Sequence, residues 1–362
     1  MRTLIYKLLG LLLLIGSFAF TWFYMDYQDF VGAPLPLHGQ ALHYVVRPGT
    51  SLRGLADTLT ARRLIEHPRY LVWLGRRMGV AQRLQAGEYE FPPGTTPRGL
   101  LSRIAEGRVV QYPLTIVDGW TFRRLMAAVE ASPVLIHTLR GLTPRRIMAR
   151  LGRPGQDPEG WFFPDTYRFP RGTSDLQFLA RAYHTMQREL QAQWQARAPG
   201  LPLKTPYQAL ILASIVEKET AVPAERAEIA GVFERRLERG MRLQADPTVI
   251  YGLGPEFNGD LTSRDLTRHT PYNTYRIDGL PPTPIAIPGL ASIRAVLHPA
   301  PGKALYFVAR GDGTHVFSET LAEHDRAVER YLLRGAGDTR PRRGTKTGPA
   351  KRRRGGAPAG AP

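Results

Sequence analysis

The sequence predicts an α+β protein that follows one N-terminal membrane-spanning helix, and three observations support this fold class. Leu8–Met25 is an 18-residue run without a charged residue. Two β-rich runs recur at a spacing of 45 residues, and each precedes a helix-like segment. From residue 113 to residue 333, apolar residues at helical spacing predict a mainly helical domain with short β elements. We therefore expect an anchor, a small module and a larger domain.

The apolar run is long enough to cross a membrane. At helical rise it comes close to the ~30 Å of a bilayer's hydrocarbon core. Arg2 and Lys7 precede it, while Asp26 and Asp29 follow it, so the positive-inside rule places residues 1–7 in the cytoplasm and the remainder outside. A cleaved signal peptide is the alternative, but the run is long for one and no A-x-A-like site follows. We expect an uncleaved single-pass anchor over residues 8–25.

The repeated unit occupies residues 41–112, after an expected linker at residues 26–40. The first copy begins at Tyr44 (YVVRPGT), the second at Tyr89 (YEFPPGT), and a third, looser version begins at Thr115. In each, a β-rich run meets a turn, and a Thr or Ser stands where it can cap the following helix. Such strand-turn-helix units resemble the LysM type of carbohydrate-binding module. A structural spacer is the alternative interpretation.

The composition excludes several classes of site. The chain has no cysteine, which rules out a disulfide framework, a thiolate nucleophile and a Cys-type zinc site. Its nine histidines show no metal-ligand spacing such as H-E-x-x-H. Ser-His-Asp, S-x-x-K and G-x-S-x-G patterns are absent, as is a phosphate-binding glycine loop. We therefore expect neither a metal nor another cofactor.

The net charge of +18 is unevenly distributed. From Arg334 onward there are nine Lys or Arg and one acid, so the tail at residues 334–362 carries +8 and the rest of the chain +10. The tail has almost no apolar residues, and we expect it to be disordered. Positive charge favours anionic polymers, namely lipid head groups, nucleic acid or a glycan with peptide carboxylates. The predicted topology places the tail outside the cytoplasm, which argues against nucleic acid.

The larger domain begins with a helical stretch from Phe122 to Arg197, interrupted by the aromatic segment Glu159–Phe169. Dense aromatic side chains usually form core, although sugar rings also stack on them. A helix then starts with Thr205 as N-cap and Pro206 at its first position, and Val222-Pro223 ends it. This helix carries the residue with the strongest catalytic signal.

That residue is Glu219. At 100° per residue it lies on the apolar stripe of the helix with Leu212, Ile215 and Val216, whereas Glu217 lies near the polar edge. A carboxyl group among apolar neighbours is harder to ionise, so its pKa rises and it can donate a proton near neutral pH, as glycosidic cleavage requires.

Two questions about Glu219 stay open at this point. A buried ion pair with Arg235 or Arg242 would give it a purely structural role. Hydrolysis by two carboxylates would need a second acid, and four are available in the sequence: Asp246, Asp260, Asp265 and Asp278.

Three blocks carry a resemblance to a known family: IVEKET at residues 215–220, DPTVIYG at 246–252 and YNTY at 272–275. With the segments around them (212–254, 271–289 and 297–300), they resemble the endolytic murein transglycosylases, also called the YceG-like family, over residues 1–332. Thr283 stands where the family has Gly in its L-P-P-G-P-I block, and the basic tail has no counterpart.

The resemblance implies an activity. The family's catalytic glutamate, the second acid of the E-K-E block, falls on Glu219. Members are inner-membrane lyases that cleave between N-acetylmuramic acid and N-acetylglucosamine in nascent peptidoglycan strands, leave 1,6-anhydromuramic ends and so terminate elongation. Their catalytic domain is similar to goose-type lysozyme. The implied partners are peptidoglycan strands, the membrane and peptidoglycan synthases.

Seven further residues are candidates for substrate binding: Glu217, Asp246, Thr248, Tyr251, Tyr272, Asn273 and Tyr275. The tyrosines and the asparagine could support an oxocarbenium-like transition state with hydrogen bonds and dipoles. Each of them more often serves packing. A non-catalytic, membrane-anchored scaffold that binds peptidoglycan through the Tyr44 and Tyr89 repeats is the alternative function.

Overall fold

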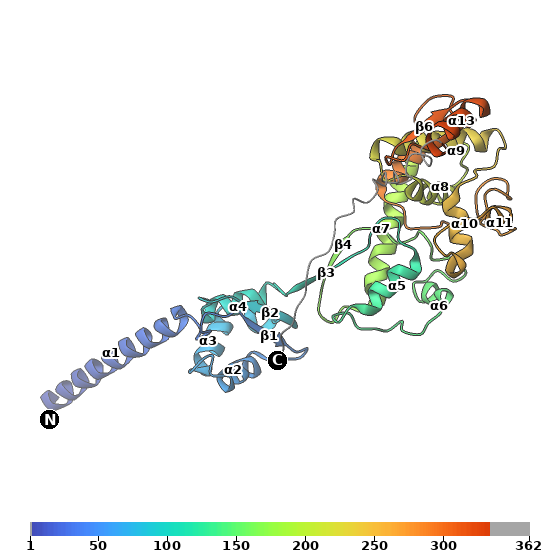
Figure 1. The fold of residues 1–362 in the computed structure, drawn as a ribbon. Coiled ribbons are helices and arrows are strands. Elements are labelled where there is room, and N and C mark those ends of the chain that lie inside the picture. Colours follow the sequence, from blue (N-terminus) through green and yellow to red (C-terminus); the bar gives the residue numbers. More distant parts are fainter. Residues whose placement is uncertain (1, 334–362) are drawn as a thin grey trace, which may run out of the picture.

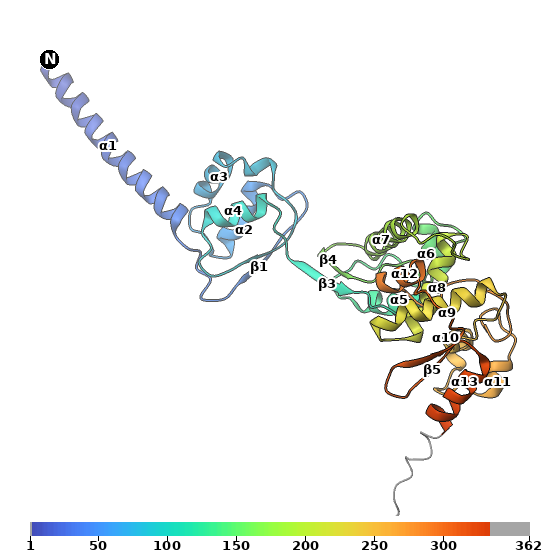
Figure 2. The same ribbon diagram turned by 90° about the horizontal axis from the view of Figure 1, so that it is seen from above.

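The structure is a computed structural model that describes residues 2–333, with side chains from residue 4 to residue 331. Figures 1 and 2 show an elongated molecule with three parts in chain order: helix α1, a small module, and a larger part that begins at β3. The mixed α+β class expected from the sequence is confirmed. The predicted disordered tail, residues 334–362, lies outside the described residues.

Helix α1 (Arg2–Gly32) is unbroken and joins the uncharged apolar run directly to the module. Among the described residues it is the one helix that is long and apolar enough to cross a membrane. Its large apolar side chains are exposed as far as Met25, but Tyr27 and Val31 are buried in the core of the module. Residues 26–32, expected in a linker, are therefore helical, because apolar side chains at helical spacing pack against the module.

The two repeated strand-turn-helix units pair with each other. β1 (Leu42–Val46) and β2 (Gly87–Phe91) are antiparallel, with Tyr44 opposite Tyr89. The helices that follow them, α2 (Leu52–Ala61) and α4 (Pro97–Ala105), start at caps Ser51 and Thr96, whose hydroxyls accept backbone N–H groups. Helix α3 (Pro68–Arg77) and the 3₁₀ turn η1 (Val80–Gln82) lie between the two units. The strands and helices enclose one core with the end of α1.

The third unit belongs to the larger part instead. β3 (Gln111–Thr115) pairs with β4 (Thr166–Pro170), and α5 (Phe122–Ala131) follows it with Thr121 as cap. This ribbon connects the module to the larger part (Figure 1). A polar contact fixes the junction: Glu88 of β2 accepts hydrogen bonds from Arg171 (2.7 Å) and from the Tyr112 hydroxyl (2.8 Å). The Arg171 guanidinium holds the pKa of Glu88 below its usual value.

The larger part is mainly helical, with one further β-hairpin, β5 (Tyr306–Ala309) and β6 (His315–Ser318). Its other helical elements are α6 (Pro144–Arg150), α7 (Asp175–Gln195), α8 (Pro206–Glu219), η2 (Pro223–Glu225), α9 (Arg226–Glu238), α10 (Asp246–Leu253), η3 (Gly254–Glu256), α11 (Ser263–Thr267), α12 (Leu290–Leu297), α13 (Leu321–Val328) and the π-helical turn η4 (Glu329–Leu333).

Two cores hold this part together. One lies around α8, α9 and α12, and the other lies around α5, α6 and the first half of α7. The aromatic segment mostly forms core: Phe162, Tyr167 and Phe169 are buried in the second of them. Helix α8 is thus packed on several sides, which positions its C-terminal end.

Candidate active site

Helix α8 begins as predicted and ends three residues earlier than Val222. Thr205 caps it by accepting the N–H of Gln208 (3.2 Å), and Glu219 is its last residue. The expected single apolar stripe is wrong, because every residue from Ala209 to Val216 is buried. Ser214 is among them: its hydroxyl donates to the Ile211 carbonyl (2.7 Å) and accepts the Ile285 N–H (3.0 Å).

Glu219 lies at the wall of a hollow of about 540 Å³. The end of α8, the start of α10, the β5–β6 hairpin and α13 surround this hollow, which we call the Glu219 hollow. Its polar lining residues are Glu219, Arg236, Gln244, Asp246, Tyr275, Tyr306, His315, His324 and Asp325. A volume of this size is in the range of small-molecule and substrate sites.

The carboxyl of Glu219 is set up to hold a proton. Burial and, to a smaller extent, the negative charge of Asp246 together raise its pKa to about 8, against the opposing effect of Arg236. Glu219 makes no hydrogen bond or ion pair with any residue that the structure describes. A neutral carboxylic acid without a protein partner can donate its hydrogen to a ligand oxygen.

The ion pairs that the sequence offered as an alternative do not form. Arg235 donates to the carbonyls of Ala304 (2.8 Å) and Ala300 (3.2 Å), and Arg242 donates to Asp278 (3.0 Å). The arginine near Glu219 is Arg236 instead. It is 6% exposed and donates to the Leu305 and Leu243 carbonyls, both at 2.7 Å. Main-chain oxygens therefore hold this cation beside Glu219 without neutralising it.

Asp246 and Tyr275 form the second polar group of the hollow. Asp246 is the first residue of α10, and its carboxylate accepts a hydrogen bond from the Tyr275 hydroxyl at 2.6 Å. Burial and the two neighbouring carboxyl groups raise the pKa of Tyr275, so the phenol keeps its proton and donates it. Of the four acids considered as a second carboxylate, Asp246 is the one that lines the Glu219 hollow.

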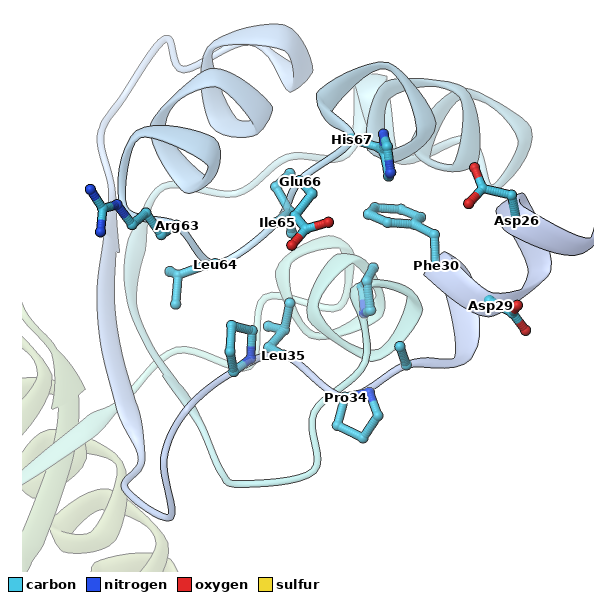
Figure 3. Close-up of a pocket in the computed structure, with 13 residues that line it drawn as sticks. Asp26, Asp29, Phe30, Pro34, Leu35, Arg63, Leu64, Ile65, Glu66 and His67 are labelled. Carbon is cyan, nitrogen blue, oxygen red and sulfur yellow. The ribbon is translucent and has the colours of Figure 1, made fainter. Parts of the chain in front are cut away.

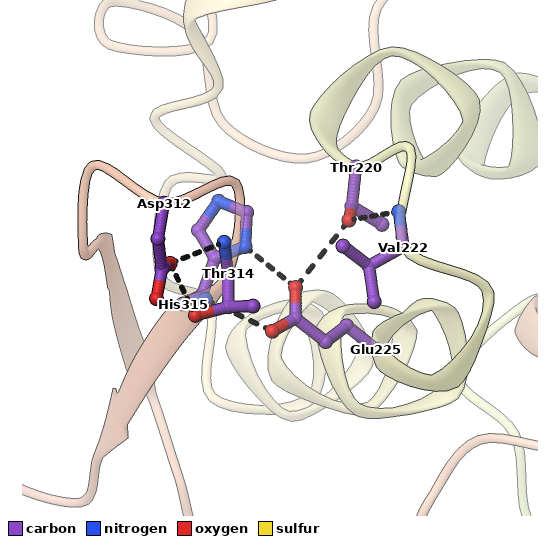
Figure 4. Close-up of polar contacts among 6 residues, drawn as sticks. All are labelled: Thr220, Val222, Glu225, Asp312, Thr314 and His315. Atoms are coloured by element: carbon purple, nitrogen blue, oxygen red, sulfur yellow. Dashed lines mark hydrogen bonds and ion pairs between the residues drawn. The ribbon is translucent and has the colours of Figure 1, made fainter.

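A set of hydrogen bonds fixes the residue that follows Glu219 (Figure 4). The Thr220 hydroxyl accepts the N–H of Val222 (2.9 Å) and donates to Glu225 (3.4 Å). Glu225 also accepts the backbone N–H of His315 (2.9 Å) and contacts its Nδ1 (2.8 Å). Burial disfavours the charge of Glu225, but the bonds from His315 outweigh it and lower the pKa. These contacts tie the end of α8 to β6, and so fix the position of Glu219.

Three of the predicted substrate-binding residues have structural partners and do not line the hollow. Glu217 accepts hydrogen bonds from the Gly289 N–H (3.0 Å) and the Ser292 hydroxyl (2.7 Å), at the start of α12. The Thr248 hydroxyl donates to the Ala245 carbonyl (2.6 Å), and the Asn273 amide donates to three carbonyls in and directly after α11. The structure does not bring these three side chains to Glu219.

Tyr251 and Tyr272 line a separate hollow of about 690 Å³, together with Glu159 and Lys218. The Tyr251 hydroxyl donates to Glu159 (3.1 Å), whose pKa burial raises to about 7. Tyr272 shares a hydrogen bond with Thr283 (2.9 Å), the residue that departs from the expected Gly. Both hollows take lining residues from the end of α8 and the start of α10, since Lys218 precedes Glu219 and Pro247 follows Asp246.

Sequence reasoning missed the wall formed by β5, β6 and α13. Arg236, Tyr306, His315 and His324 line the hollow, and none of them was a candidate. Single histidines and arginines in a chain with 49 Lys and Arg give no local signal. These residues reach the site only through the fold; His315, for example, contacts Glu225, which lies 90 residues away in the sequence.

Comparison with known proteins identifies relatives of this chain. Residues 44–330 match the YceG-like family. The endolytic murein transglycosylase of Bacillus subtilis (strain 168) is 37% identical over 174 residues, which are 48% of this chain and 48% of that protein. The endolytic murein transglycosylase of Streptococcus pneumoniae (strain D39) is 31% identical over 180 residues, which are 48% of this chain and 32% of that protein.

One solved structure is similar as well. A crystal structure of a YceG-like protein from Listeria monocytogenes matches 80% of this chain and 99% of that chain, at 27% identity and a TM-score of 0.48. The sequence match spans about half of the Bacillus protein and about a third of the Streptococcus protein.

Proposed function

The chain belongs to the YceG-like family, and from this premise we propose that it is an endolytic lytic transglycosylase of peptidoglycan. It cleaves the bond between N-acetylmuramic acid and N-acetylglucosamine within glycan strands and leaves 1,6-anhydromuramic ends, which terminates strand elongation. Glu219 is the catalytic residue. The observation that carries this proposal is a carboxyl group with a pKa near 8 that faces an open hollow without a protein partner.

Glu219 acts first as an acid and then as a base. In its neutral form it protonates the glycosidic oxygen, and the bond from C1 to this oxygen breaks. The resulting carboxylate takes the proton of the muramic C6 hydroxyl, whose oxygen bonds to C1 of the same sugar. Glu219 is then neutral again, and no water is consumed. One acid/base residue is therefore sufficient.

Asp246 has an electrostatic role in this mechanism. Its negative charge favours the neutral form of Glu219 before reaction and favours positive charge at the sugar in the oxocarbenium-like transition state. The bond from Tyr275 holds the Asp246 carboxylate in place. The larger hollow with Tyr251, Tyr272 and Lys218 extends the site along α8 and receives the neighbouring sugars.

The same proposal covers the other parts of the chain. α1 is a single-pass anchor in the inner (cytoplasmic) membrane, with residues 1–7 in the cytoplasm, the module at residues 41–112 and the catalytic domain at 113–333 outside. Burial of Tyr27 and Val31 supports an uncleaved anchor, because removal of α1 would expose the module's core. The module is LysM-like and binds glycan, the catalytic domain is lysozyme-like, and peptidoglycan synthases are partners.

Product analysis tests the activity. The full-length protein is incubated with purified peptidoglycan, and the released fragments are identified by mass spectrometry. Anhydromuramic ends are expected from wild type and from Glu130→Gln, a control at an exposed glutamate of α5. Glu219→Gln should lose activity by at least about 10²-fold.

Two results would contradict the proposal. Reducing ends, which are heavier by one water, would mean hydrolysis with Asp246 as the second carboxylate. Co-sedimentation with peptidoglycan without any product would mean a non-catalytic scaffold.

A further inference from the structure

Ring contacts between α1 and α3 fix how the module sits on the membrane-spanning helix. Phe30 contacts His67 (6.4 Å between ring centres), Tyr27 contacts Trp73 (4.3 Å), and Phe23 lies 6.5 Å from Trp73. The contact thus moves toward the N-terminus of α1 as α3 proceeds toward its C-terminus. The two helices are therefore antiparallel, and the last turn of α3 is directed toward the apolar run.

The end of α3 lies at the level where a membrane begins. Phe23 is part of the uncharged run Leu8–Met25, so its partner Trp73 stands beside the last turn of that run. Arg76 and Arg77 follow one turn later, about 5 Å farther toward the membrane at ~1.5 Å per residue. If α1 crosses a bilayer, these side chains cannot avoid its head groups.

A basic hollow opens at this position. It has a volume of about 490 Å³, and its charged and aromatic lining residues are Arg53 and Asp57 of α2 and Arg69, Trp73 and Arg76 of α3. Three cations therefore face one carboxylate, and the hollow is basic on balance. The three arginines make no hydrogen bond or ion pair with any residue that the structure describes. Trp73 is 44% exposed, although it is large and apolar. Unpaired guanidinium groups around an exposed indole are typical of a surface that meets lipid phosphates.

The charge differs on the neighbouring surface. The hollow at the junction of α1 with the loop before α3 carries three carboxylates, Asp26, Asp29 and Glu66, against one arginine, Arg63 (Figure 3). An anionic membrane repels these carboxylates and attracts the arginines of α2 and α3. Only one of the two surfaces is therefore suited to lie on such a membrane.

We propose that Arg53, Arg69, Trp73 and Arg76 form a binding site for the head-group phosphates of anionic phospholipids in the membrane that α1 spans. The guanidinium groups bind phosphate oxygens, and the Trp73 indole lies at the level of the glycerol backbone. The module then rests on the membrane surface rather than standing clear of it. This site does not depend on the catalytic activity, and Glu219→Gln should leave it unchanged.

Depth-dependent fluorescence quenching tests the proposal. Because the chain has no cysteine, one can be introduced at Val72, beside the hollow, and labelled in the full-length protein. A control label is placed at Gln195, at the exposed end of α7. Proteoliposomes are made from phosphatidylcholine with and without phosphatidylglycerol, and the quencher is a nitroxide on lipid head groups. We expect quenching at residue 72, stronger with phosphatidylglycerol, and none at residue 195.

Charge variants then assign the contact to the arginines. Each arginine near an anionic surface is expected to favour docking by about fivefold. Replacing Arg53, Arg69 and Arg76 together by Gln should therefore reduce quenching in anionic liposomes to the level in phosphatidylcholine, while Lys at all three positions should retain most of it. The substituted side chains are exposed, and thermal unfolding checks that the module stays folded.

Four outcomes would overturn the proposal. If the label at residue 72 is quenched no more than the label at residue 195, the module lies away from the membrane. Equal quenching in both lipids would mean that the module contacts the membrane without preference for anionic head groups, and undiminished quenching in the Gln variant would mean that the arginines do not make the contact. Loss of quenching on addition of inorganic phosphate, but not of chloride at the same ionic strength, would assign the arginines to a soluble phosphate compound.

Discussion

Replacement of Asp246 by Asn isolates the electrostatic part of the proposed mechanism. Glu219 has a pKa of about 8, so about nine-tenths of the molecules carry the catalytic proton at pH 7. At an unperturbed 4.5 the neutral fraction would be about 0.3%, so the environment accounts for a factor of about 300 at this pH. The negative charge of Asp246 is one of the two causes of the rise, after burial.

Asn at position 246 removes this charge and should therefore lower the pKa of Glu219 by about one unit, the size of shift that a nearby, solvent-screened charge produces. Since the neutral form is active, kcat/KM of the free enzyme should start to fall near pH 7 instead of near pH 8. The assay is the rate of anhydromuramic product formation between pH 5 and pH 9. Above the pKa of Glu219, this rate should fall about tenfold per pH unit. Asp278→Asn, at an exposed acid that pairs with Arg242, is the matched control. An alkaline limb that stays in place or moves upward in Asp246→Asn would refute this reasoning.

Three further predictions concern stability. Glu234 is 4% exposed, and burial raises its pKa to about 8, above the unfolded 4.5. Stability is therefore lost as pH rises from 4.5 to 8, and Glu234→Gln should raise the free energy of unfolding by about 3 kcal/mol at pH 7, measured by denaturant titration, with no such gain at pH 4. Arg171→Gln leaves the carboxylate of Glu88 at the junction without its cation and should cost about 1 kcal/mol, read as earlier urea unfolding, whereas an unchanged midpoint would mean that the contact is incidental. Tyr27→Ala removes a side chain that is 3% exposed and should lower the free energy of unfolding of the module by about 3 kcal/mol. Amide hydrogen exchange in α3 and α4 should become faster; exchange at the wild-type rate would mean that α1 does not stabilise the module.

The sequence was most informative where the determining interactions are local. The start of α8 follows from Thr205 and Pro206, because an N-cap and its bond partner are three residues apart. The repeat located the two strands that begin at Tyr44 and Tyr89, but not that they pair with each other, because pairing is a long-range contact. The continuation of α1 to Gly32 was missed because Pro34 and Pro36 dominated the interpretation of a segment whose apolar side chains already had helical spacing.

The candidate site was only partly predictable for the same reason. Glu219 and Asp246 lie in one run of sequence, and the roles proposed for them rest on helix geometry and charge. The burial of α8 on all sides could not be read from that helix, since it depends on α9 and α12, which pack against it from later in the chain. Arg236 was not distinguishable from Arg235 by sequence, because a turn of 100° decides which of the two faces the hollow.

The shared core of α1 and the module joins the two rigidly, so they move as one body. A helix that is free at its end can lean in the bilayer without effect on what it carries, but here any lean of α1 must rotate the module with it. Bilayers of different thickness change the lean of a spanning helix. Lipid composition would thereby set the angle at which the larger part points away from the membrane, and with it the direction from which a strand can enter.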